Sequence, residues 1–171
     1  MHVLVATDGR LDPAEVARFA KPLAGEDGQV TILTVVEIPR QLLRELRSQM
    51  GELPEVDVDI DVEYVEPPAA STGTPRGWPG DDAMIARYLE DKRVQYTQPL
   101  VDALVAVDVN ATGVVIESED PAKAILTESE DRDVDVVLIG AHGQGFFEGL
   151  LGSTGTKVVR RSRQPVLVLK N

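Results

Sequence analysis

The chain contains several apolar runs that are hydrophobic without alternation. Strands buried on both faces of a parallel sheet have this pattern. Helical patterns lie between the runs, and such alternation implies a parallel sheet covered by helices on both faces. Because crossovers are right-handed, we predict an α/β fold with a doubly wound, five-stranded parallel sheet. The predicted strands are residues 2–7, 30–36, 111–116, 134–139 and 166–169.

Two of the predicted helices begin with an aspartate followed by a proline. Asp12 is the expected N-cap of a helix that ends at Gly25, with the proline at its first position. Asp120 is followed by proline in the same way and begins a helix that ends near residue 131. A longer helical stretch covers residues 81–104, with a kink or break predicted at Pro99.

Residues 51–80 do not fit this alternation, so we predict one domain over residues 1–171 with an insertion there. Residues 56–64 alternate strictly between apolar and acidic side chains, as an exposed strand does. The acidic face could be a cation site. A calcium loop, however, needs a turn with a central glycine, and this segment has neither, so we favour a solvated strand face. Residues 66–80 have the composition of a loop, which could be a flap or a tether.

The composition leads us to expect a soluble protein of the cytoplasm. The 171 residues include no cysteine, which excludes disulfides and thiolate metal sites. There is no basic-then-apolar leader, and no apolar stretch approaches the roughly 20 residues of a membrane span. The net charge of −12 argues against nonspecific binding to nucleic acid or to an anionic membrane surface.

The charge is unevenly distributed along the chain. Residues 51–80 hold seven acidic side chains and one arginine, whereas no acidic residue follows Ser153. We expect the basic residues after Ser153 to lie near a helix C-terminus, where they favour the helix dipole. A basic surface for an anionic ligand or partner is the alternative. These residues are Lys157, Arg160, Arg161, Arg163 and Lys170.

The most informative segment follows the strand predicted at residues 134–139. Five glycines lie from residue 140 to residue 152, and a helix is predicted to begin at Ser153 and Thr154. Glycines leave backbone N–H groups unobstructed, and a helix N-terminus carries about half a positive charge. The Gly-Lys-Ser/Thr of a P-loop is absent, and Lys157 lies a turn inside the helix. We therefore predict a phosphate site of another kind.

Two predicted strands end in residues suited to ligand binding. In a doubly wound sheet, ligands bind beyond the carboxyl ends of the strands, at the point where the strand order reverses. The first strand ends in Thr7 and Asp8 and the fourth in Gly140, so Asp8 is expected to face the phosphate loop. A carboxylate there is useful with Mg²⁺, a water or a sugar hydroxyl. The alternative is a plain turn residue before a helix.

At these residues the chain resembles the universal stress protein family. The resemblance covers residues 2–36 and 110–170, through V-L-V-A-T-D-G, V-T-I-L-T-V-V-E, D-P-A-K-A-I-L and the glycine segment that ends in Q-P-V-L-V-L. It implies the family's sheet order 3-2-1-4-5, which places the switch point between the strand ends at Asp8 and Gly140. Many members of the family bind ATP through G-x2-G-x9-G-(S/T).

Carried over to this chain, the resemblance implies an adenine-nucleotide site. Asp8 would lie beside the nucleotide, the Val35 backbone would meet the adenine, and Gly140 would lie near the ribose. Gly143, Gly152 and the two residues after it would surround the phosphates, with Mg²⁺ near Asp8 if it accompanies the nucleotide. We expect His142 to be a loop residue at the phosphate, with an acid–base role as the alternative. The implied site residues are Thr7, Asp8, Val35, Gly140, His142, Gly143, Gly152, Ser153 and Thr154.

The glycine loop departs from the family motif in its length. Eight residues separate Gly143 from Gly152, where the motif has nine. ATP is the ligand that the motif implies, but AMP or cyclic AMP could suit the shorter loop better. The leading hypothesis is an adenine-nucleotide-binding module with a regulatory or stress-related role. A slow ATP hydrolase that uses Asp8 or His142, and an association module without nucleotide, are the alternatives.

The last predicted strand, residues 166–169, is short and apolar. The family's sheet order places it at an edge, and bare edges invite pairing. Antiparallel pairing of two such edges about a two-fold axis is the family's usual dimer. We therefore expect a homodimer through this strand, with an edge covered by residues 56–64 of a monomer as the alternative.

Overall fold

The computed structural model describes residues 1–38, 81–141 and 151–170. The chain divides into two compact units, residues 1–37 with 87–171 and residues 38–86. The predicted acidic strand and the loop that follows it lie outside the described residues, as do His142 and Gly143. One domain with an insertion at residues 51–80 therefore remains a prediction.

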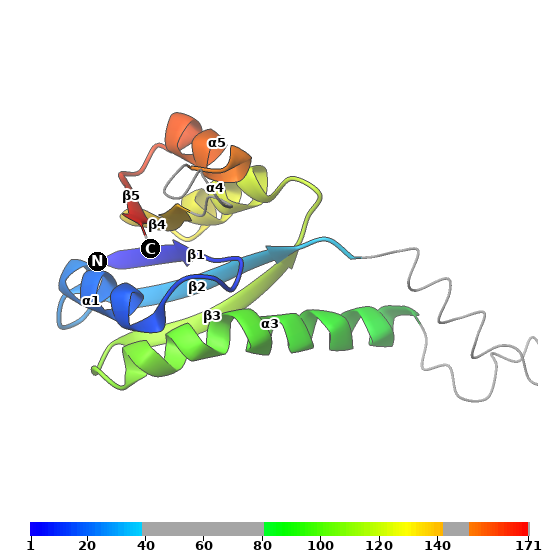
Figure 1. The fold of residues 1–171 in the computed structure, drawn as a ribbon, viewed down its shortest axis with the longest axis horizontal. Helices are drawn as coiled ribbons and strands as arrows, with labels where there is room; N and C mark the ends of the chain where they lie inside the picture. The colour runs from blue at the N-terminus through cyan, green and yellow to red at the C-terminus, as the bar shows by residue number, and fades with distance from the viewer. Residues whose placement is uncertain (39–80, 142–150, 171) are drawn as a thin grey trace, which may run out of the picture. The chain divides into compact units, whose positions relative to one another are not determined.

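Strands and helices alternate along the described residues (Figure 1). The five strands agree with the predicted ones to within two residues at each end. In chain order the elements are β1 (His2–Ala6), α1 (Pro13–Ala24), β2 (Gln29–Val36), α3 (Asp81–Val105), β3 (Asn110–Glu117), α4 (Pro121–Asp131), β4 (Val136–Ala141), α5 (Ser153–Arg161) and β5 (Val166–Lys170).

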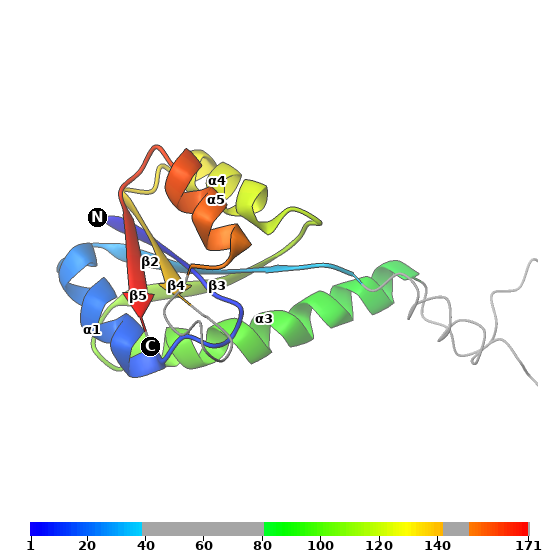
Figure 2. The ribbon, with the colours of Figure 1, turned by 45° about the horizontal axis from the view of Figure 1, so that its top comes forward.

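The five strands form one parallel sheet in the order β3-β2-β1-β4-β5. Helices α1 and α3 cover one face of the sheet, and α4 and α5 cover the other (Figures 1 and 2). Each face has its own buried apolar cluster, with Val3 and Val5 of β1 on the first and Leu4 on the second. The predicted doubly wound fold and strand order are confirmed. Strands β2 and β3 extend the sheet on one side of β1, and β4 and β5 extend it on the other side. The strand order therefore reverses between β1 and β4, and their carboxyl ends form the switch point.

The aspartate–proline signals lie where the sequence predicts them. The Asp12 carboxylate accepts a hydrogen bond from the Glu15 backbone at 3.0 Å, and Asp120 accepts one from Lys123 at 3.3 Å. Helix α1 ends at Gly25, whose φ of +76° favours glycine. Both caps satisfy backbone N–H groups that the first turn of a helix leaves without a partner.

Of the kink or break predicted at Pro99, the break is wrong, because α3 continues through this residue from Asp81 to Val105. Proline removes one backbone hydrogen bond from a helix interior. Burial of Leu100 and Leu104 just beyond it holds this part of the helix against the sheet. The approach is close, because a Cβ on Gly113 of β3 would collide with the Thr97 hydroxyl of α3.

Candidate functional site

A cavity of about 310 Å³ lies at the switch point. Its lining comes from the ends of β1, β2 and β4 and from the first turns of α4 and α5, which lie side by side on the same face (Figure 2). The cavity is large enough for a small ligand by the usual size of such sites. The lining residues are Ala6, Thr7, Asp8, Leu33, Val35, Pro121, Ile125, Ile139, Gly140, Gly152, Ser153, Thr154, Gly155 and Val158.

The end of β1 forms a tight turn at one side of the cavity. The Thr7 backbone donates to the Leu33 carbonyl at 2.9 Å, which extends the β1–β2 pairing by one residue. The Thr7 hydroxyl then accepts a hydrogen bond from the Gly9 backbone at 2.9 Å. Gly9 has a φ of +86°, and the Tyr96 ring of α3 packs directly against it. The chain can therefore reverse direction here while Asp8 lines the cavity.

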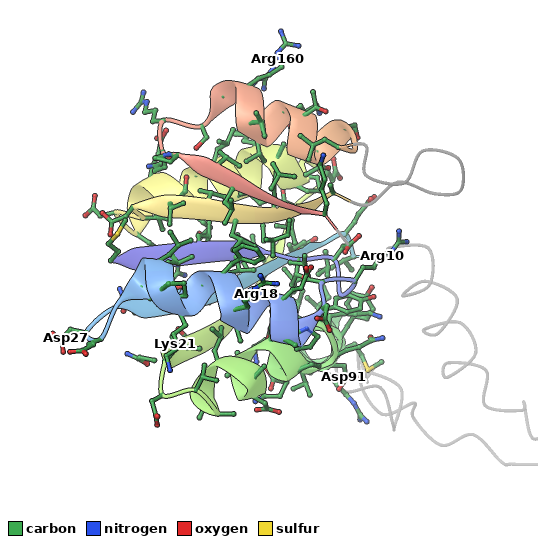
Figure 3. The ribbon with its side chains drawn as sticks, turned by 60° about the vertical axis from the view of Figure 1, so that its left-hand side comes forward. Arg10, Arg18, Lys21, Asp27, Asp91 and Arg160 are labelled. Atoms are coloured by element: carbon green, nitrogen blue, oxygen red, sulfur yellow. The ribbon has the colours of Figure 1, made fainter. Side chains whose placement is uncertain are left out.

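Asp8 has a role in this turn as well as a place in the cavity. Its Oδ1 accepts a hydrogen bond from the Arg10 backbone at 3.2 Å, and its Oδ2 lies 3.7 Å from Arg10 Nε. Figure 3 shows Arg10 beside the carboxyl ends of the strands, whereas Asp27 lies at the opposite end of the sheet. The turn interpretation and the binding interpretation of Asp8 are thus compatible.

The backbone of Val35 is directed into the space beyond β1. The Leu33 carbonyl pairs with β1 at Thr7, and the Val36 carbonyl pairs on the β3 side with Ser118 at 3.0 Å. Because hydrogen-bonding groups of a strand alternate sides, the N–H and C=O of Val35 point the same way as those of Leu33. The last β1 residue in register is Ala6, opposite Leu33. A planar donor–acceptor edge, such as a nucleobase, could therefore pair with Val35.

Much of the cavity lining is apolar. Leu33, Ile139 and Val158 contribute to it, and α4 adds Pro121 and Ile125. The sequence prediction missed these residues, because their pattern is that of ordinary core positions. The available signal was the Asp-Pro start of α4, which places its first turn at the carboxyl edge of the sheet. An apolar wall beside polar groups is the usual composition of a small-molecule site.

The N-terminus of α5 faces the cavity. Its N-cap is Gly152, which has no side chain to cap the first turn, and the turn contains no acidic residue. The first intrahelical bond runs from Thr156 N to Gly152 O at 2.9 Å, so the preceding N–H groups, at Ser153, Thr154 and Gly155, have no partner within the helix. These groups and the helix dipole favour an anion at this position.

Two basic residues predicted to follow Ser153 lie in the last turn of α5, which confirms their expected place near a helix C-terminus. They are Arg160 and Arg161, and Arg160 projects away from the sheet (Figure 3). Lys157 lies nearer the cavity, with Nζ 3.9 Å from Oδ1 of Asp120. Asp120 therefore caps α4 and also faces a cation of α5.

Seven of the predicted site residues line this one cavity. They are Thr7, Asp8, Val35, Gly140, Gly152, Ser153 and Thr154. Within the described ranges 1–38, 81–141 and 151–170, no group of three or more histidine, aspartate or glutamate side chains could hold a metal ion. No helix in this part of the chain is long and apolar enough to cross a membrane.

Sequence comparison identifies the family of this chain. A model of the universal stress protein family matches residues 1–170. Universal stress protein MJ0577 of Methanocaldococcus jannaschii is 41% identical to the chain over 51 residues. That alignment covers 29% of this chain and about a third, 32%, of the relative. The resemblance seen in the motifs is confirmed.

Solved structures share the fold. The structure of MJ0577 matches with a TM-score of 0.60 and 20% identity, over 99% of this chain and 95% of that chain. The universal stress protein of Archaeoglobus fulgidus in complex with dAMP matches at 0.54 and 18%, over 99% and 98%. A universal stress protein family protein of Arabidopsis thaliana with AMP bound matches at 0.55 and 13%, over 100% and 92%.

Proposed function

This chain belongs to the universal stress protein family, and from that premise we propose that it binds an adenine nucleotide in the switch-point cavity. The observation that carries the proposal is the convergence of seven predicted site residues on one cavity. Its lining combines apolar side chains with two polar groups, the Val35 backbone and the N-terminus of α5. These are the kinds of group that a nucleotide needs, a donor–acceptor edge for the base and N–H groups for the phosphate.

The relatives support the same class of ligand. Their solved structures include an A. fulgidus protein with dAMP and an A. thaliana protein with AMP. In this chain, the base would pair with the Val35 backbone, the ribose would lie near Asp8 and Gly140, and the phosphate would lie at Gly152, Ser153 and Thr154. ATP is the ligand that the family motif implies. Because the spacing before Gly152 is eight residues and not nine, AMP and cyclic AMP are tested as well.

The role that we propose is regulatory, in a stress response in the cytoplasm, with the nucleotide as the signal. A homodimer through β5 is part of the proposal. Strand β5 is the last strand in the sheet order, and Val166 and Val168 are only partly buried in the protomer. Pairing two such edges about a two-fold axis would satisfy their backbone groups and cover these side chains.

Calorimetric titration of the purified full chain with ATP, Mg-ATP, AMP and cyclic AMP tests the proposal. The informative variant is Gly152→Val, because a Cβ at this residue meets no atom of the described residues within 4 Å. Its φ of −62° is also open to any residue. The side chain would fill the space that a phosphate needs, so we expect binding to be lost and folding retained. Loss of the N-cap glycine destabilises α5 by roughly 1 kcal/mol at most.

Gly152→Ala is the graded control. It changes the cap in the same way but adds one methyl group, so we expect it to weaken binding less than valine does. Thermal melts of both variants would verify folding. Full nucleotide affinity in Gly152→Val would refute the proposed phosphate position. If no adenine nucleotide binds the wild-type protein, the association-only alternative replaces this proposal.

A further inference from the structure

The described cavity lining carries little charge. Among its 14 residues, Asp8 is the only one with an ionisable side chain. Residues 151–156, which lead into and begin α5, contain neither lysine nor arginine. The phosphate would therefore meet backbone N–H groups, hydroxyl groups and a helix dipole worth about half a charge.

Among the described residues, two cations near this lining each face a carboxylate. Arg10 Nε lies 3.7 Å from Asp8 Oδ2 on the β1 side. Lys157 Nζ lies 3.9 Å from Asp120 Oδ1 where α4 and α5 begin. Within each pair the two charges offset each other, and both pairs are about half exposed. The protein as a whole is at −12, which adds repulsion against anions.

We propose that this site selects adenine nucleotides by phosphate charge, and that the Asp120–Lys157 pair sets the selection. The inference rests on the proposed function and refines its ligand to a nucleotide of low charge, a monophosphate or cyclic monophosphate. Each further phosphate adds charge that must leave water, and the described lining offers no matching cation. Asp120 holds Lys157 at the start of α4, and so withholds from the ligand the one lysine in the first two turns of α5.

Affinity is therefore ordered by charge. AMP and cyclic AMP bind more tightly than metal-free ATP, by roughly five- to tenfold, the effect of about two uncompensated charges at a solvent-accessible site. Mg²⁺ reduces the difference in affinity between AMP and ATP because it neutralises part of the triphosphate charge. Added salt reduces this difference as well, since exposed charges are screened.

Asp120→Asn isolates the charge of this pair. Asparagine is as good an N-cap as aspartate, so the hydrogen bond from Lys123 and the start of α4 are retained. The variant releases Lys157 toward the phosphates. We expect metal-free ATP to bind roughly three- to tenfold more tightly than in the wild type, with a smaller gain for AMP. The double variant Asp120→Asn with Lys157→Gln loses this gain.

Asp102→Asn is the matched control. It raises the net charge by the same unit, but Asp102 lies on α3, on the other face of the sheet, where it accepts a hydrogen bond from Gln98 at 2.7 Å. We expect it to leave the AMP-to-ATP ratio unchanged. A similar shift in this control would assign the effect to overall charge and overturn the role of Asp120.

Titration of each variant with AMP, cyclic AMP, ATP and Mg-ATP separates the outcomes. A wild-type preference for the monophosphates that narrows in Asp120→Asn supports the inference. Metal-free ATP binding as tightly as AMP in the wild type would overturn it and leave nucleotide binding in place. An unchanged ratio in Asp120→Asn would overturn the role of this pair. Failure of every nucleotide to bind would overturn the proposed function together with the inference.

Discussion

Gly9→Ala tests how the turn that carries Asp8 is held. Gly9 has a φ of +86°, and an added Cβ would lie 2.5 Å from Cδ1 and 3.1 Å from Cε1 of the Tyr96 ring. Tyr96 is itself supported, because Lys92 Nζ lies 5.0 Å from its ring centroid. The substitution thus adds two separate penalties, a backbone conformation that alanine disfavours and a collision with a packed ring.

The size of each penalty can be estimated from this geometry. A left-handed backbone costs a residue with a Cβ roughly 1–2 kcal/mol. Overpacking against a ring that has to shift costs typically about 1–3 kcal/mol. We therefore expect Gly9→Ala to lower the free energy of unfolding by about 2–5 kcal/mol, a large part of the roughly 5–15 kcal/mol of a typical domain.

A double-mutant cycle separates the two penalties. In a Tyr96→Ala background the collision is absent, so Gly9→Ala should cost only the backbone term of roughly 1–2 kcal/mol. The difference between the two backgrounds, about 1 kcal/mol or more, is the coupling energy between the two positions. Tyr96→Ala alone will also destabilise the protein, since it removes ring packing and a cation–π contact.

Urea unfolding followed by circular dichroism measures these free energies. Midpoints and slopes should be compared for the four proteins, because a changed slope signals a change other than stability. Equal costs of Gly9→Ala in both backgrounds, within about 0.5 kcal/mol, would show that Tyr96 does not support the turn. The contact between α3 and the Asp8 turn would then have no energetic role.

Three further predictions concern α1, α3 and β5. Asp12→Ala should lower the free energy of unfolding by about 1 kcal/mol in denaturant titrations, because Glu15 N loses its cap, whereas Asp12→Asn should be nearly neutral. Hydrogen bonds from Arg93 at 2.7 and 2.8 Å hold the pKa of the Glu90 carboxyl below its usual 4.5. The ionised pair therefore stabilises the fold above pH 4.5, and this stabilisation is lost as the pH falls through the lowered pKa. Glu90→Gln should therefore lower the melting temperature slightly at neutral pH and less at acid pH. If the melting temperatures of the wild type and Glu90→Gln depend on pH in the same way, this prediction is contradicted. Val168→Lys should yield a monomer in light scattering, and an unchanged mass would exclude dimerisation through β5.

Local sequence signals determined most of the elements. The unbroken apolar runs of β1, β2 and β4 are typical of strands buried on both faces. The two Asp-Pro pairs begin helices because each supplies a capping oxygen and a preset φ at the next residue. Pro99 shows the limit of such signals, since the buried side chains beyond it keep α3 continuous.

The candidate site was predicted in its polar part and missed in its apolar part. Asp8 and Gly140 follow apolar runs and Gly152 precedes a helix start, so the change of residue type along the chain marked these three residues. Ile125 and Val158 have the spacing of any buried helix residue, and only their place beside the cavity distinguishes them. Asp120 has two roles, as the N-cap of α4 and as the ion-pair partner of Lys157, and nothing in the sequence near Asp120 indicates the second role.

The sequence by itself determined the α/β class, the strands, the helix starts and the family, because each depends on residues close together along the chain. Only the tertiary structure decided which of these residues meet. The parallel sheet brings Asp8 and Gly152 to one edge, although 143 positions separate them in the sequence. It also decided the charge beside the cavity, because ion pairing depends on distances across elements. That pairing is the physical reason to expect a site for a nucleotide of low charge.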